Sequence, residues 1–249
     1  MLKDIYLSVL IYNRLTEKRA IFMETVVCAR GKDTSCIAAA SSKFDGFRRE
    51  PLHDARKPKV KSNPTIEAMG TAWLKCGDIS SDDWALTYDR MLNLINKFEY
   101  SAKDVEDFSL VLIELQEGDD FQIKAGFFLS ALINNCHEDD FVINTAHLDR
   151  LIDRLGWHNT KNITVEGSVG AFAGVMMESG TITVMGNASD GIGFLMKGGT
   201  ITVHGNTGGV VGWSVEGGEI HLNGDYEDSV GENRIFGKIF HNGVLIAGK

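Results

Sequence analysis

Four residues between positions 158 and 221 have side chains suited to acid–base chemistry: His158, Asp190, His204 and His221. Histidine titrates near neutral pH and works with carboxylates as a general acid or base. Asp190, however, lies in the turn-like sequence SDGIG, and His204 and His221 occupy outward positions of predicted strands. A structural role is therefore the favoured interpretation, and catalysis by these residues is the alternative hypothesis.

A second group of candidate catalytic residues is acidic or lies next to a cysteine. Its members are Asp82, Asp83, Glu138, Asp139, Asp140 and the adjacent pair Cys136 and His137. Carboxylates that precede an apolar run at helical spacing stabilise a helix N-terminus, and the acids at 138–140 are predicted to lie in an interhelical loop. Adjacent Cys and His side chains point in different directions on most backbones, so sequence adjacency does not indicate a catalytic dyad.

Motifs that bind metals or cofactors are missing from the sequence. No group of His, Cys and Asp has a zinc-binding spacing, and neither a GxxxxGK[ST] phosphate loop nor a GxSxG nucleophile elbow occurs. We therefore expect no metal and no cofactor, and we assign no catalytic residue.

The net charge of −9 is unevenly distributed, with a basic excess in residues 43–62. A basic arm lying against the acidic region that follows is the favoured interpretation. Binding of an anion or a nucleic acid is the alternative, but the pI near 5.3 makes nucleic acid an unexpected partner. The residues that would carry it are Arg48, Arg49, Arg56, Lys57, Lys59 and Lys61.

Membrane insertion and secretion are not expected. The longest apolar runs fall short of the roughly 20 residues that cross a bilayer, and the first residues lack the features of a secretory signal. The four cysteines have no CxxC spacing, which favours free thiols in a reducing compartment. The predicted location is the cytoplasm.

Glycine divides the chain into two parts, because 20 of the 27 glycines lie in residues 161–249. This break in composition predicts an α+β protein of two domains, a mainly helical domain at 1–157 and a β-helix domain at 158–249. Within the first domain, apolar spacing and capping signals predict helices over 80–98 and 101–115, from 119 or 120 onward, and over 145–155.

The glycine-rich part repeats every 19 residues without a slip in register. Ile163, Ile182, Ile201, Ile220 and Ile239 mark the period. Three columns of glycine follow it: Gly167, Gly186, Gly205, Gly224 and Gly243; Gly174, Gly193, Gly212 and Gly231; and Gly180, Gly199, Gly218 and Gly237. A fixed period near 20 residues predicts a solenoid whose coils bury their apolar faces against one another.

Alternation within each repeat predicts a parallel β-helix. In the I-T-V strands Ile and Val face inward and Thr faces outward, which predicts a ladder of Thr164, Thr183 and Thr202. A second inward run, such as Ala173, Val175 and Met177, follows in each coil, with the glycines at 174, 193 and 212 expected to face outward. Asn187 and Asn206 are expected to stack at a corner. The helices and Trp157 are expected to cover the first coil, and the core is expected to close at the fifth.

The repeat resembles a known family. GSVGAFAGVMMESGTITVMG, GIGFLMKGGTITVHG and GGVVGWSVEGGEIHLNG are similar to the GXGXG repeat domain found in the large chain of glutamate synthase and in one of the chains of formylmethanofuran dehydrogenase. The resemblance covers residues 161–249. It implies a right-handed β-helix that serves as a scaffold between catalytic parts, and it carries over no catalytic residue.

Three classes of function follow. The leading hypothesis is a non-catalytic scaffold or interaction protein, whose flat β-helix wall binds another protein or a second copy of the chain. The alternatives are an enzyme with a site where the helices meet the β-helix, or a subunit of an oxidoreductase complex. The third class is the anion- or nucleic-acid-binding module based on residues 43–62.

Overall fold

A computed structural model describes residues 60, 63–77, 79, 84–227, 229–233 and 236–248 of the chain. The chain divides into two compact units, Met1–Asp54 and Ala55–Lys249, and all described residues belong to the second. The predicted basic arm lies outside the described residues apart from Val60, and so do Ser80, Asp82 and Asp83. In the described part, no helix is both long and apolar enough to cross a membrane.

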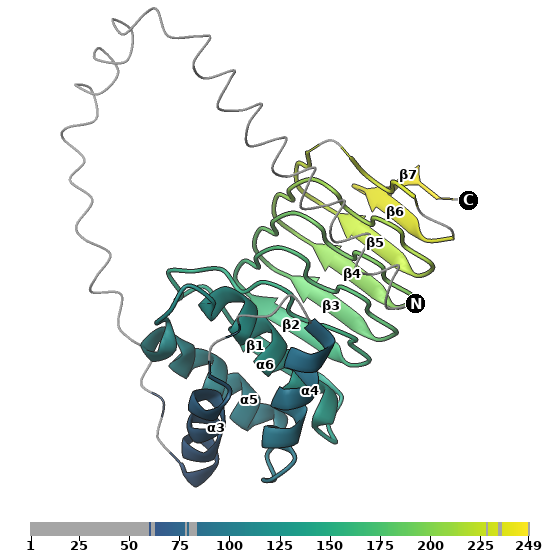
Figure 1. The fold of residues 1–249 in the computed structure, drawn as a ribbon. Coiled ribbons are helices and arrows are strands. Elements are labelled where there is room, and N and C mark those ends of the chain that lie inside the picture. The colour runs from purple at the N-terminus through teal and green to yellow at the C-terminus, as the bar shows by residue number, and fades with distance from the viewer. Residues whose placement is uncertain are drawn as a thin grey trace, which may run out of the picture. The chain divides into compact units, whose positions relative to one another are not determined.

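Helices make up the first half of the described chain (Figure 1). They are α3 (Pro64–Lys75), α4 (Trp84–Ile95), α5 (Ala102–Val111), which continues as the short 3-10 helix η2 (Leu112–Leu115), and α6 (Phe121–Asn135). The predicted helices in 80–98, in 101–115 and from 120 are confirmed as α4, α5 and α6. Helix α3 was not predicted, although Asn63 caps it through a 2.8 Å bond from the Ile66 N–H and Pro64 occupies its first turn.

The core of the helical part is aromatic. The Trp73 ring of α3 lies 5.5 Å from Phe128 and 6.1 Å from Phe121 of α6, and 6.5 Å from Phe108 of α5. Helix α6 is the central element, because its residues from Ala125 to Ile133 are all buried. A helix that is buried on every side is surrounded by other elements, and here those elements include the first coil of the solenoid.

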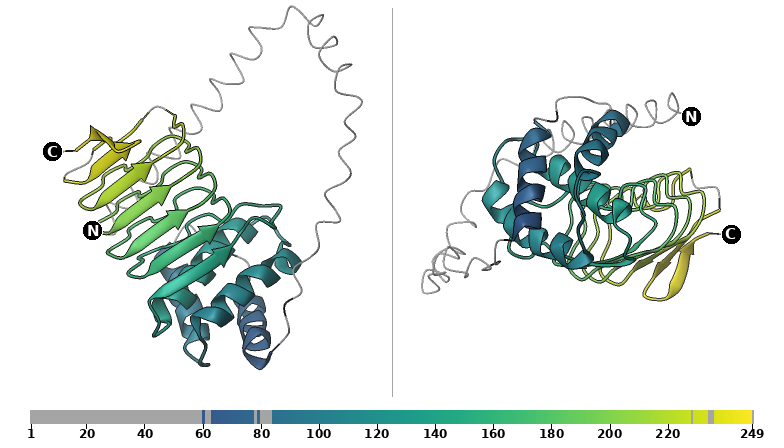
Figure 2. Two further views of the ribbon diagram at one scale, coloured as in Figure 1. Left: turned by 180° about the vertical axis from the view of Figure 1, so that it is seen from behind. Right: turned by 90° about the horizontal axis from the view of Figure 1, so that it is seen from below.

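A parallel β-solenoid makes up the second half (Figures 1 and 2). Its strands form one seven-stranded sheet in sequence order. They are β1 (Asp140–Asn144), β2 (Asn162–Glu166), β3 (Thr181–Val184), β4 (Thr200–Val203), β5 (Glu219–Leu222), β6 (Lys238–His241) and β7 (Val244–Ala247). Strands β1 to β6 pair in parallel, and β7 pairs with β6 in antiparallel orientation.

The predicted register between coils is confirmed from β2 to β6. Ile163, Ile182, Ile201, Ile220 and Ile239 are paired neighbours and almost fully buried. Thr164, Thr183 and Thr202 form the predicted ladder on the opposite face of the strands. The predicted asparagine corner also exists, since the Asn206 N–H donates to Asn187 Oδ1 over 2.8 Å.

The first coil of the solenoid precedes the 19-residue repeat. Strand β1 pairs with β2 through Asp140 and Asn162, an offset of 22 residues. The helix predicted over 145–155 is therefore wrong, because this segment forms turns of the first coil. Its backbone bonds across the structure rather than along a helix: the Asp153 N–H donates to Gln122 O, and the Arg154 N–H to Ala171 O.

The glycines at 174, 193 and 212 face the interior, which corrects the predicted outward orientation. A Cβ on Gly174 would lie 2.4 Å from Ile201 Cδ1, and one on Gly193 would lie 2.6 Å from Ile220 Cδ1. The reason is that this part of each coil is a chain of turns and not a strand. Positive φ angles recur at alternate residues, as at Phe172, Gly174 and Met176, and they turn the intervening side chains Ala173 and Val175 inward as well.

The helices cover the first coil, as predicted. The Ser130 hydroxyl of α6 accepts hydrogen bonds from the N–H groups of Gly156 (2.9 Å) and Trp157 (3.1 Å). The Trp157 ring contacts Phe127 of α6 at 5.1 Å and Trp84 of α4 at 5.7 Å, both edge to face. Buried side chains of the helices thereby replace the preceding coil that the first coil lacks.

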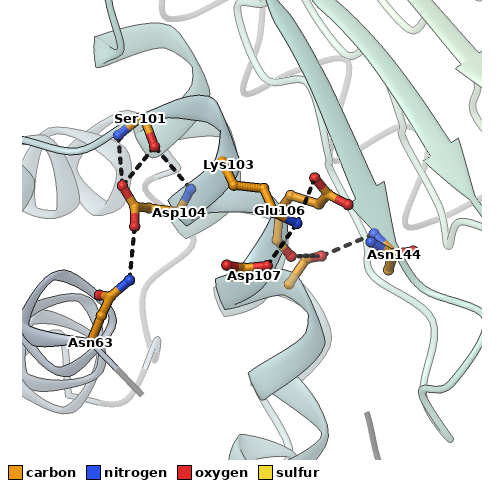
Figure 3. Close-up of polar contacts among 8 residues, drawn as sticks. Asn63, Ser101, Lys103, Asp104, Glu106, Asp107 and Asn144 are labelled. Atoms are coloured by element: carbon orange, nitrogen blue, oxygen red, sulfur yellow. Dashed lines mark hydrogen bonds and ion pairs between the residues drawn. The ribbon is translucent and has the colours of Figure 1, made fainter. Parts of the chain in front are cut away.

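Helix α5 is held to its neighbours by a polar network at its N-terminus (Figure 3). Ser101 and Asp104 form the capping box that the sequence predicts, and Asp104 Oδ1 also accepts a 3.1 Å bond from the Asn63 amide. Burial raises the pKa of Asp104, but the bonds from Ser101 and Asn63 outweigh it and the pKa is lowered. The carboxylate form thus stabilises the start of α5 and its contact with α3.

Replacing Ser101 with alanine is expected to lower the free energy of unfolding by about 1 kcal/mol at pH 7. Because the folded-state pKa of Asp104 is lowered, its contribution is complete above the unfolded value and is lost as the pH falls below about 4. The cost of Ser101→Ala should therefore be smaller at pH 3 than at pH 7 in urea unfolding followed by circular dichroism. Ser101→Thr, which keeps the hydroxyl, is the control; an equal cost for both variants would contradict the capping role.

Candidate functional site

His158 belongs to a row of polar side chains that runs from coil to coil. Its Nδ1 lies 3.1 Å from Glu178 Oε1, and Lys197 Nζ lies 3.1 Å from the same oxygen. His158 and then Lys197 lower the pKa of Glu178, so this carboxylate is held in its charged form. Sequence reasoning missed Glu178 and Lys197, although their spacing of 19 residues places them at equivalent positions of successive coils.

Asp190 connects two coils. Its Oδ1 accepts a 2.8 Å hydrogen bond from the Gly209 N–H in the next coil. Asp153 does the same two coils earlier in the stack, where it accepts a 2.8 Å bond from the Ala171 N–H. The pKa of Asp153 is raised, because burial outweighs the opposing effects of this hydrogen bond and of the nearby Arg154. Both carboxylates thus serve as acceptors for backbone N–H groups at the turns, which is the structural role favoured from the sequence.

Replacing Asp190 with alanine is expected to lower the free energy of unfolding by about 1–2 kcal/mol, because the Gly209 N–H loses a charged acceptor. Asp190→Asn keeps a carbonyl oxygen at the same place and is expected to cost about 0.5 kcal/mol or less. Urea unfolding of both variants measures the difference. Equal stability of the alanine variant and the wild type would contradict the structural role and would return Asp190 to the catalytic candidates.

The remaining histidine candidates lie on the strands and have separate partners. His204 Nδ1 lies 3.2 Å from the Asn223 amide nitrogen in the next coil. The His221 ring stacks on Phe240 of β6 at 4.8 Å with an interplanar angle of 5°, and its Nε2 lies 3.3 Å from Glu219. His204, His221, His158 and Asp190 each have a different described hydrogen-bond partner. The four predicted candidates are therefore not brought together as one constellation by any described contact.

The acids at 138–140 join the helices to the first coils. Glu138 accepts a 3.1 Å bond from the Ala102 N–H at the start of α5, and Asp139 pairs with Lys161 at 2.7 Å. The predicted interhelical loop is wrong, because this segment joins α6 to a strand and not to another helix. Asp140 begins β1 and accepts a 3.0 Å bond from the Asn162 amide. Cys136 is a buried free thiol whose Sγ lies 3.7 Å from Tyr100 O. The structural interpretation of these residues is thus supported.

The described residues contain no group of three or more His, Cys, Asp or Glu placed to hold a metal ion. A shallow groove of about 370 Å³ lies between α3 and α4. Its lining is apolar apart from a threonine and two lysines: Ala68, Thr71, Ala72, Lys75, Leu94, Lys97 and Phe98. The lining contains no histidine, cysteine or carboxylate.

Strands β1 to β6 lie side by side and present one regular outward face (Figure 2). We call this face the wall; its central row consists of Val142, Thr164, Thr183, Thr202, His221 and Phe240. Two apolar side chains of the wall are exposed, Val142 by 36% and Met185, just after β3, by 48%. The wall is therefore a surface of threonines at its centre, with His221 and Phe240 towards β6 and isolated exposed apolar side chains, and its described residues form no concave pocket of the kind that catalytic sites use.

Comparison with known proteins finds no matching family model, no matching curated protein and no matching solved structure.

Proposed function

We propose that this protein is a non-catalytic scaffold or protein-interaction protein whose solenoid wall binds another protein. The observation that supports the proposal best is the exposure of Met185 and Val142 on a flat wall held in register by parallel strands. Burial of apolar side chains under a partner lowers the free energy of the complex. This proposal includes a right-handed winding of the coils and a cytoplasmic location. It also includes a division into a helical domain and a β-helix domain, with the border earlier than residue 158 because β1 at Asp140–Asn144 already belongs to the solenoid sheet.

The resemblance of the 19-residue repeat to the GXGXG domain adds a second line of support. In glutamate synthase and formylmethanofuran dehydrogenase that domain serves as a scaffold, which agrees with a non-catalytic role for this chain. The alternative is an enzyme with a site between helices and solenoid, or a subunit of an oxidoreductase complex. It has less support because Asp190 is used in a bond between coils, and His158, His204 and His221 have separate neighbours.

A charge placed on the wall tests the proposal. Tagged wild-type protein is used to capture proteins from extracts of its native cells, beside Met185→Glu and the control Leu74→Glu. Leu74 is an exposed leucine of α3, away from the wall. A specific partner should be retained by the wild type and the control, lost at least 10-fold with Met185→Glu, and recovered when the partner itself is tagged. Capture of no specific partner by the wild type, or equal capture by all three proteins, would contradict the proposal.

A further inference from the structure

The last strand of the sheet, β7, exposes an uncharged apolar edge. Val244 is 65% exposed, Leu245 48% and Ile246 38%, and Phe236, just before β6, is 72% exposed. Strand β7 pairs with β6 on one side through an Asn242–Gly243 turn in which both residues have positive φ. Among the described residues, no strand pairs with its other side. The backbone N–H and C=O groups that point to that side need a partner or water.

The two edges of the sheet differ in whether another described element covers them. At the first edge, helix α5 lies against β1, and the Ser109 hydroxyl accepts a 3.0 Å bond from the Asn144 N–H. The β1 edge is thus covered and bonded by the protein itself (Figure 3). At the β7 edge no described helix lies against the strand, and the strand carries neither a charged residue nor a proline that would discourage pairing.

We propose that a second copy of this chain pairs with β7 edge to edge, in antiparallel orientation around a two-fold axis. An antiparallel pair of identical strands is self-complementary, since each copy presents the same donors and acceptors to the other. The strand that would be buried is itself uncharged, although the chain carries a net charge of −9, and Lys238 beside it faces Glu219 at 3.5 Å. Two copies therefore meet here without placing like charges opposite each other.

The consequence is a sheet that continues from one molecule into the next, with the exposed apolar side chains of β7 covered at the junction. This inference goes beyond the proposed function, because it uses the edge of the sheet and leaves the wall free for another protein. The dimer does not depend on whether the wall has a partner. Its failure and the failure of the wall proposal can therefore be told apart.

The oligomeric state of the full chain tests the inference. Light scattering after gel filtration should give twice the 27.3 kDa chain mass for the wild type and for the control Leu74→Lys. Leu245→Lys and Val244→Lys each place a charge on the paired strand and should weaken dimerisation at least 10-fold, with unchanged circular dichroism. Two variants are used so that misfolding of one does not decide the result.

Hydrogen exchange separates the possible occupants of the edge. In the dimer, the amides of residues 244–247 should exchange slowly at high protein concentration and faster on dilution. A monomeric wild type would overturn the inference. If the amides are protected in that monomer, a segment of the same chain such as residues 1–59 covers the edge. A dimer that both lysine variants leave unchanged would overturn the inference as well, since its interface would lie elsewhere.

Discussion

Replacing Gly126 with alanine is expected to lower the free energy of unfolding by about 3 kcal/mol or more. Gly126 lies on α6 where the helix touches the backbone of the first coil, and an added Cβ would lie 1.7 Å from Asp153 O and 2.8 Å from Asp153 C. That backbone has little freedom to move away, because the Asp153 N–H donates to Gln122 O and its carboxylate accepts from Ala171. The helix and the coil must therefore separate.

Gly70 provides a matched control, because it is also a glycine within a helix. A Cβ there meets nothing within 4 Å, so Gly70→Ala in α3 should raise stability by about 0.5–1 kcal/mol through helix propensity alone. Urea unfolding followed by circular dichroism measures both variants. Opposite signs would show that α6 is packed directly on the first coil, and a stabilising effect of Gly126→Ala would contradict that packing.

Replacing Gly180 with alanine is the second change with a large expected effect, again a loss of about 3 kcal/mol or more. Two costs add: the left-handed backbone at φ +76° costs an alanine roughly 1–2 kcal/mol, and the added Cβ would lie 2.2 Å from Lys161 O in the preceding coil. The same carbonyl accepts the Thr181 N–H over 3.1 Å. Relief of the contact would therefore require breaking the stack of the two coils.

Gly243 separates the two costs, because its φ of +77° is nearly the same while a Cβ there meets nothing within 4 Å. Gly243→Ala should lose only the backbone cost, roughly 1–2 kcal/mol. The difference between the two variants in thermal and urea unfolding measures the contact between coils. Equal losses at both positions would show that the coils tolerate a methyl group between them.

The sequence predicts the stacked coils well because their contacts recur at a fixed separation. Each strand residue pairs with the residue 19 positions away from β2 to β6, so the period of Ile163, Ile182 and Ile201 is also the register of the sheet. The 19-residue period does not predict the first coil, because this coil is longer and has Phe141 in place of the isoleucine. The leucines and isoleucines over 145–155 have the spacing of a helix. The backbone of this segment nevertheless bonds to other segments, and these bonds determine its conformation.

The candidate site is less predictable because the decisive partners are backbone groups. Asp190 bonds to the Gly209 N–H, and every residue except proline offers such a donor, so no residue type in the sequence marks the contact. The outward orientation of Gly174 and Gly193 was inferred from the alternation of a strand, and it failed because alternate positive φ angles redirect the side chains. The Asn242–Gly243 pair, in contrast, is a sequence signal for the hairpin that ends the sheet, although the 19-residue repeat alone does not predict that hairpin.

The coils also set a length. Each added coil moves the end of the sheet by one strand spacing, about 4.8 Å. The helices close the first coil, and the hairpin of β6 and β7 follows the last, so neither end depends on how many coils lie between them. Deleting residues 200–218, one full period, would join equivalent positions and shorten the distance between the ends by one step. The number of repeats therefore fixes the distance between the helices at one end of the solenoid and the β6–β7 hairpin at the other.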